Sequence, residues 1–109
     1  MPSPSDWNAA VLRGITLVTS LRQRSGTIGT TAAALEADSI PVKWIVLMAD
    51  DDNTGGIFWG ASDVANTGSL AGGRLIAGRA VTIPIDDLNK VFIVGSAADQ
   101  TYRYVAGRE

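Results

Sequence analysis

Short apolar runs alternate with polar, glycine-rich stretches along the chain, and this pattern predicts strands joined by turns. The clearest run is residues 42–49, which begins directly after Pro41, a position where a missing N–H does little harm. Residues 81, 83 and 85 share one face of another strand, in which Pro84 suggests an edge position or a bulge. Residues 30–36 are predicted as a strand because Thr30, Thr31 and the turn that follows favour one, but the helix propensity of the alanines leaves a helix open. The expected strands are 15–21, 30–36, 42–49, 57–60, 74–77, 80–85, 90–95 and 101–105.

Polar residues that tolerate turns separate these strands. Residues 22–29 read as a loop, and residues 50–56 as a turn that joins 42–49 and 57–60 into a hairpin. A glycine-rich connection is expected over 61–73, with further turns at 86–89 and 96–100. About seven or eight short strands without a long helix predict an all-β fold, an antiparallel β-sandwich or jelly-roll-like barrel with an extended N-terminal arm.

The arm comprises residues 1–14, and residues 15–109 form a single β-sandwich domain in this interpretation. Asp6 is a suitable N-cap for one or two helical turns, on which Trp7, Val11 and Leu12 would share a face. A tryptophan on a terminal arm is costly to leave in water, so it either folds back onto its own core or docks on a neighbour. We therefore take Trp7, Val11 and Leu12 as candidate intersubunit contacts.

Composition removes most routes to catalysis. The 109 residues include no cysteine and no histidine. Disulfides, thiolate metal sites and thiol nucleophiles are therefore excluded, and the commonest general base and metal ligand is missing. A cupin-type enzyme on a similar fold would need a histidine-lined metal site. The expectation is a protein that is not an enzyme, with no catalytic residue, no cofactor and no metal.

Charge and hydropathy likewise argue against two classes of partner. The formal net charge is -2, and the nine cationic residues are scattered along the chain, which predicts no nucleic-acid partner. The longest apolar stretch, residues 44–49, is far shorter than the roughly 20 residues a membrane helix needs. Residues 1–6 lack the features of a signal peptide, so no membrane partner is predicted and the chain is expected to stay where it is made.

Three motifs resemble functional sites and are better explained as turns. The triplet at 50–52 lacks the glutamate that closes a calcium loop, since position twelve is Ala61. The glycine spacing over 73–80 lacks the lysine and hydroxyl of a phosphate loop. The neighbouring carboxylates at 86 and 87 favour loop capping over acid–base catalysis. Core packing is favoured over a stacking platform for the aromatic residues Trp44, Trp59, Phe92, Tyr102 and Tyr104.

Roughly residues 35–106 resemble a group of small virion proteins of tailed bacteriophages. In that group a strand leads to an Asn-Thr-Gly turn, and an I-[FY]-[VW]-G-x-S-[DG]-V segment follows. A V-x-[IL]-x-[IV]-D-D-L-x-K-[VI] hairpin and a final Q-x-[VY]-R-Y strand complete the plan. The matching segments are PVKWIVLMA at 41–49, NTGGIFWGASDV at 53–64, AVTIPIDDLNKVFIVG at 80–95 and QTYRYV at 100–105.

This resemblance implies a β-sandwich or jelly-roll subunit of a phage particle. Such subunits are often capsid decoration (cement) proteins, which bind and stabilise the shell of the major capsid protein and are frequently homotrimers. The implied partners are the major capsid protein and further copies of the chain. The implied location is the outer capsid surface of the virion, after synthesis in the host cytoplasm. The alternative is a receptor- or glycan-binding fibre or tail module on the same fold.

Overall fold

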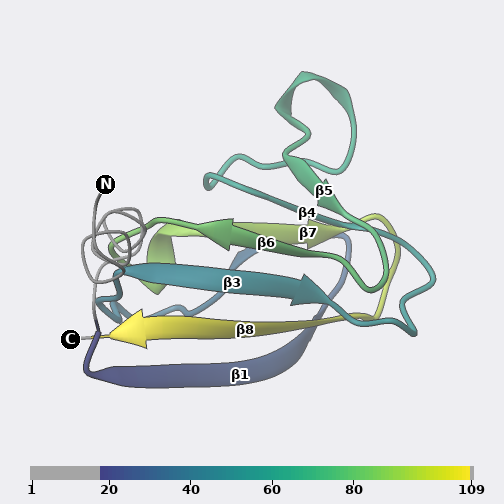
Figure 1. The fold of residues 1–109 in the computed structure, drawn as a ribbon. Helices are drawn as coiled ribbons and strands as arrows, with labels where there is room; N and C mark the ends of the chain where they lie inside the picture. The colour runs from purple at the N-terminus through teal and green to yellow at the C-terminus, as the bar shows by residue number, and fades with distance from the viewer. Residues whose placement is uncertain (1–17, 109) are drawn as a thin grey trace, which may run out of the picture.

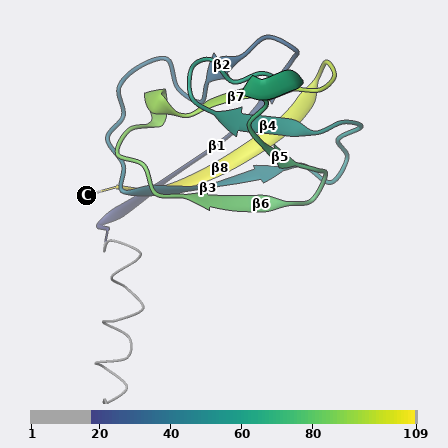
Figure 2. The same ribbon diagram turned by 90° about the horizontal axis from the view of Figure 1, so that it is seen from above.

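The computed structural model describes residues 18–108, which form two four-stranded antiparallel sheets packed face to face (Figure 1, Figure 2). Sheet A has the strand order β1-β8-β3-β6, and sheet B the order β2-β7-β4-β5. Two single turns of 3₁₀ helix, η1 and η2, complete the regular structure of this part of the chain. The elements are β1 (Ser20–Ile28), β2 (Ala33–Ala34), β3 (Trp44–Ala49), β4 (Ile57–Gly60), η1 (Gly68–Leu70), β5 (Gly73–Leu75), β6 (Ala80–Ile83), η2 (Leu88–Lys90), β7 (Phe92–Gly95) and β8 (Gln100–Arg108).

The strand pairing is nested, which defines the topology. β1 pairs with β8, β2 with β7, β3 with β6 and β4 with β5, and successive pairs fall alternately in sheet A and sheet B. Folding four nested pairs across two layers in this way produces a jelly roll. The predicted all-β sandwich or jelly-roll fold is therefore confirmed for the described residues.

The core lies between the sheets and follows the two-residue period of the strands. On β3, Ile45 and Leu47 point inward and are fully buried, and on β8 Tyr104 is 1% exposed. Sheet B contributes Ile57 and Ile93 from its own inner face. Apolar residues of both layers thus form one continuous cluster, as expected of a sandwich.

One predicted loop is wrong. Residues 22–29 were expected to be a loop, but nearly all of them belong to the nine-residue strand β1, which pairs with β8 along its whole length. The stretch lacks an apolar pattern because β1 is an edge strand whose outer side chains are exposed. Its inner side is filled by β8 instead, as at Gly26, where an added Cβ would lie 2.8 Å from the Tyr102 hydroxyl. Residues 15–17 lie outside the described part of the chain.

The predicted hairpin is also wrong. Residues 42–49 and 57–60 do form strands, β3 and β4, but β3 pairs with β8 and β6 in sheet A. β4 pairs with β7 and β5 in sheet B. The polar loop between them, residues 50–56, crosses from one sheet to the other, and a polar turn of this length permits that crossing as readily as a hairpin.

The remaining expectations hold with shifted bounds. The ambiguous segment 30–36 contains strand β2, and the short piece at 74–77 corresponds to the edge strand β5. β6 is an edge strand that ends directly before Pro84, as the missing donor suggested. The last strand, β8, is longer than the predicted 101–105 because its partner β1 is longer as well.

A hydrogen-bond clamp fixes the crossing loop to the start of β8. The Gln100 side chain is 1% exposed, accepts from the Gly55 N–H at 2.8 Å and donates to Thr54 Oγ1 at 3.3 Å. The Asn53 amide donates to the Thr101 carbonyl at 2.8 Å and accepts from the Thr101 N–H at 2.7 Å, as a neighbouring strand would. The loop is therefore part of the fold and not a free surface segment.

We expect Gln100→Ala to lower the free energy of unfolding by on the order of 1–3 kcal/mol, because the partly buried Gly55 N–H loses its acceptor. Urea unfolding followed by tryptophan fluorescence measures the change. Gln23→Ala, at an exposed glutamine on β1, serves as the control and should change stability by less than about 0.5 kcal/mol. Equal effects of the two substitutions would contradict the clamp.

Candidate functional site

The outer face of sheet A carries an apolar stripe along β3, on the side where an antiparallel sheet is normally polar. On β3 the inward residues alternate with Trp44, Val46 and Met48, which point away from the core and are half-buried. Val105 on β8 and Leu21 on β1 extend the same surface, and Leu21 is 61% exposed. A strand with apolar side chains on both faces is typical of a strand that is covered on both faces.

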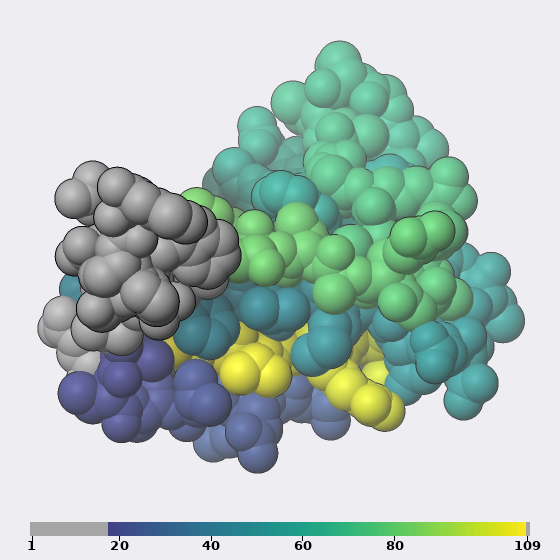
Figure 3. Space-filling model, viewed as in Figure 1, coloured from purple at the N-terminus to yellow at the C-terminus, as the bar shows by residue number. Residues whose placement is uncertain are grey.

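The strand register arranges these side chains in rows. Leu21, Gly107 and Trp44 lie opposite one another across β1, β8 and β3. The Trp44 indole occupies the space above Gly107, where an added Cβ would come within 2.6 Å of Trp44 Cε2. The next row brings Val105 beside Val46. Figure 3 views this face, with β3 in teal and β8 in yellow between β1 in purple and β6 in green.

The two sheets differ in how the chain covers their outer faces. On sheet B the connection over 61–72 packs against the strands: Val64 is 7% exposed and lies next to Gly60, and the Asn66 amide donates to the Gly95 carbonyl at 3.0 Å. Among the described residues no such connection crosses the outer face of sheet A (Figure 1). The apolar surface of sheet A is therefore left open by residues 18–108.

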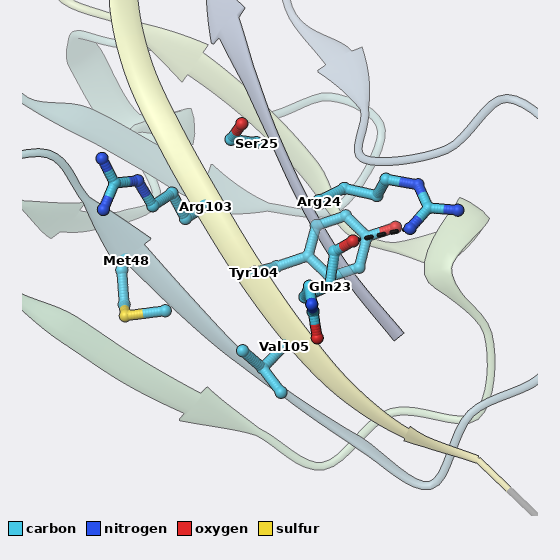
Figure 4. A pocket seen from close by; sticks show the side chains of 7 residues that line it. All are labelled: Gln23, Arg24, Ser25, Met48, Arg103, Tyr104 and Val105. Atoms are coloured by element: carbon cyan, nitrogen blue, oxygen red, sulfur yellow. Dashed lines mark hydrogen bonds between the residues drawn. The ribbon is translucent and has the colours of Figure 1, made fainter. Parts of the chain in front are cut away.

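A shallow hollow of about 590 Å³ marks the middle of this face. Its far end is polar, since Arg103 is paired with Asp50 at 3.1 Å. The lining of the hollow is mixed, because Met48 and Val105 offer apolar contact and Gln23, Ser25 and Arg103 offer polar groups. The residues around the hollow, drawn in Figure 4, are Gln23, Arg24, Ser25, Met48, Arg103, Tyr104 and Val105.

One polar atom on this face lacks a partner. The Trp44 Nε1 is buried and finds no acceptor among the described residues. Buried donors are nearly always hydrogen-bonded in folded proteins, because losing water without a replacement costs roughly 1–3 kcal/mol. The exception lies at the end of the face where β1 begins.

The most buried titratable cluster lies on the inner side of sheet A and is structural. Arg22 Nε donates to the Tyr104 hydroxyl at 3.0 Å, and that hydroxyl donates to Glu36 Oε1 at 2.5 Å. The Tyr104 hydrogen bond, followed by Arg22, holds the pKa of Glu36 below its ordinary value. Burial, followed by the bond to Glu36, raises the pKa of Tyr104. The cluster ties β1 and β8 to the segment after β2, and each of its groups is already engaged.

The neighbouring carboxylates of Asp86 and Asp87, which the sequence analysis weighed as an acid–base pair, also stabilise the fold. Asp87 accepts hydrogen bonds from the Ile40 and Asn89 N–H groups and from the Ser39 hydroxyl. The Ser39 hydroxyl is the largest of the influences that lower the pKa of Asp87. Asp86 pairs with Lys90 at 2.9 Å. The predicted capping role is thus confirmed for Asp87, whereas Asp86 forms an ion pair instead. Within residues 18–108 no three acidic side chains come together to hold a metal ion.

The aromatic residues divide between core and surface. Tyr104 is a core residue, and Trp59 and Tyr102 pack against the core, as predicted. Trp44 is different, because it lies on the outer face of sheet A above Gly107. The sequence signal that points to this surface is the unbroken apolar run at 44–49, in which both alternating sets are apolar. The predicted contacts Trp7, Val11 and Leu12 lie outside the described residues.

Comparison with known proteins adds no family. No protein-family model matches the chain, and no curated protein matches it. A chain from a solved structure of Bacillus endospore appendages, described as a novel family of disulfide-linked pili, is similar with a TM-score of 0.47 and 20% identity. The similarity covers 83% of this chain and 87% of that chain, and at this level it carries no argument about function. No helix of the described residues is long and apolar enough to cross a membrane.

We expect Glu36→Gln to lower stability at neutral pH by on the order of 1 kcal/mol and to flatten its acid dependence. Because the folded-state pKa of Glu36 is lowered, its stabilisation is present above the ordinary value of 4.5 and is lost as pH falls below it. Urea unfolding across this range measures both effects. Asp38→Asn, at an exposed carboxylate, is the control. A wild-type acid dependence retained in Glu36→Gln would contradict the assignment.

Proposed function

We propose that the chain is a structural protein of a tailed-phage particle, a capsid decoration protein that binds and stabilises the shell of the major capsid protein. The observation that carries the proposal is the apolar outer face of sheet A, centred on Trp44, Val46 and Met48. A face of this kind, on a fold whose clustered polar groups already bond to each other, suits a protein that works by docking.

The mechanism in this proposal is mechanical. Apolar area that is buried between neighbouring subunits must be exposed again before the shell can come apart, so each docked copy opposes separation. Specific interfaces usually bury upward of about 1,000 Å². Because the contact would repeat over the particle surface, and copies would also associate as a homotrimer, each single contact can be modest.

The phage-like motifs support the proposal through their place in the fold. The Asn-Thr-Gly turn and the final Gln-x-Tyr-Arg-Tyr strand are joined by the Asn53 and Gln100 clamp. The Asp-Asp pair of the motif at 80–95 contributes the cap at Asp87, although this segment is not a hairpin, because it connects β6 in sheet A to β7 in sheet B. Motifs far apart in the sequence thus serve one framework, which favours a common structural plan with the virion proteins over a chance match.

The proposal predicts that Val46→Asp weakens binding to capsids at least about tenfold, because an unpaired carboxylate would be buried in an apolar interface. Cosedimentation of the purified chain with shells of the major capsid protein from the same phage genome measures the affinity. Ser69→Asp is the control, since Ser69 is exposed on the 61–72 connection, away from the outer face of sheet A. Circular dichroism establishes that both variants fold. Failure of the unmodified chain to cosediment would refute the proposal.

Deletion of residues 1–14 should lower occupancy on the same shells by about tenfold or more, because Trp7, Val11 and Leu12 are the expected intersubunit anchors. The midpoint of thermal unfolding should stay within a few degrees of the full chain. Occupancy is read from the stain intensity of the chain relative to the major capsid protein. Unchanged occupancy would remove the role proposed for the arm.

A further inference from the structure

We infer that a second copy of this chain docks at the corner where strand β5 leads into strand β6. The corner comprises the turn at residues 76–79, the acidic loop at 50–52 and the hollow between the two strands. β6 is the edge of sheet A opposite to β1. The inference goes beyond the proposed function, because it concerns how copies meet each other and holds whether or not the chain binds capsids.

The two sheets part at this corner and leave apolar side chains accessible. β5 and β6 are edge strands of different sheets and lie at the same open side of the sandwich (Figure 2). The hollow between them has a volume of about 500 Å³. Trp59 and Val81 line it, and both pack against the core while remaining only partly buried. Ile76 lies at its margin and is 46% exposed, so the corner offers apolar contact to a partner.

The backbone fixes the turn against the acidic loop. The Gly78 N–H donates to the Ala49 carbonyl at 3.0 Å, and the Ala49 N–H donates to the Arg79 carbonyl at 2.9 Å. Gly78 has a φ of +80°, a left-handed conformation that favours glycine. A Cβ added to this glycine would come within 2.6 Å of Asp51 Oδ1. The Asp51 carboxylate therefore lies directly beside the turn that carries Arg79.

Four charged side chains at this corner have no partner among residues 18–108. Asp51 and Asp52 are exposed on the acidic loop, and Arg74 and Arg79 are exposed at the margin of the hollow. None of the four forms an ion pair or a side-chain hydrogen bond with another described residue. The third carboxylate of the loop, Asp50, is already paired with Arg103. Two positive and two negative groups thus remain available beside an apolar hollow.

Opposite charges that lie side by side favour a second copy over a ligand of a single charge. An acidic segment that reached Arg79 would also meet Asp51, and a basic segment that reached Asp51 would also meet Arg79. A second copy related by a two-fold axis through the corner avoids both repulsions, since Asp51 of each copy then meets Arg79 of the other. The same axis brings the two hollows face to face and buries Ile76 of each copy.

Reversal of the charges tests the contact in the absence of capsids. We expect the unmodified chain to self-associate at low salt, with a dissociation constant measured by sedimentation velocity over a range of concentrations. Arg79→Asp and Asp51→Arg should each raise this constant by about tenfold, because each places like charges together in both halves of the contact. A chain that carries both changes should regain the native constant within about threefold, because the two signs are exchanged.

Arg24→Asp is the matched control, since it makes the same change of net charge at an exposed position on β1, the opposite edge of sheet A. A mixture of the two single variants should associate as the unmodified chain does, because each supplies the charge that the other needs. Ile76→Ser tests the apolar part of the contact and should also weaken association, since Ile76 is exposed and its replacement leaves the core intact. Circular dichroism establishes that each variant folds.

Three results would each overturn the inference. They are an unmodified chain that stays monomeric up to about 0.1 mM, equal effects of Arg79→Asp and Arg24→Asp, and no recovery in either the combined variant or the mixture. Capsid cosedimentation is measured separately. A failed self-association and a failed capsid function therefore remain distinguishable.

Discussion

β3 carries apolar side chains on both of its faces, and both the fold and the proposed function depend on that constraint. Its inner set, with Ile45 and Leu47, is buried against sheet B. Its outer set, with Trp44, Val46 and Met48, has no cover among residues 18–108. The hydrophobic effect acts equally on both sets, so the strand that fixes the core also creates a surface that favours a partner.

Nested strand pairing makes this arrangement specific. Because β8 pairs with both β1 and β3, the last strand places Val105 and Gly107 between Leu21 and Trp44. The glycine leaves room for the indole to lie flat, so the apolar side chains form one surface and not separate ridges. The clamp at Asn53 and Gln100 fixes the start of β8 and thereby the register on which this surface depends.

The polar groups of the chain are used to hold the framework together. Glu36 and Arg22 converge on the Tyr104 hydroxyl, Asp87 caps η2, and Gln100 fixes the crossing loop. A carboxylate or phenol engaged in this way has an altered pKa for structural reasons, which explains the shifted groups without a catalytic role. The apolar side chains on the outer face of β3 take no part in this polar framework.

The sequence by itself determined the strands in which buried and exposed residues alternate. It also determined the segments whose residue types favour turns. The apolar run at 42–49, the edge proline at Pro84 and the capping carboxylate Asp87 each express a local preference of the backbone or side chain, and the structure follows them. Tertiary structure alone decided which strands pair. The loop at 50–56 permits a hairpin or a crossing, and only the contacts with Gln100 and Thr101 select the crossing. For the same reason the polar sequence of β1 becomes a strand only because β8 lies beside it. Val105 becomes a neighbour of Val46, and Leu21 joins the row of Trp44, only through pairing between strands far apart in the sequence. A local pattern cannot encode that proximity, because it arises from long-range contacts in which each strand contributes half of the surface.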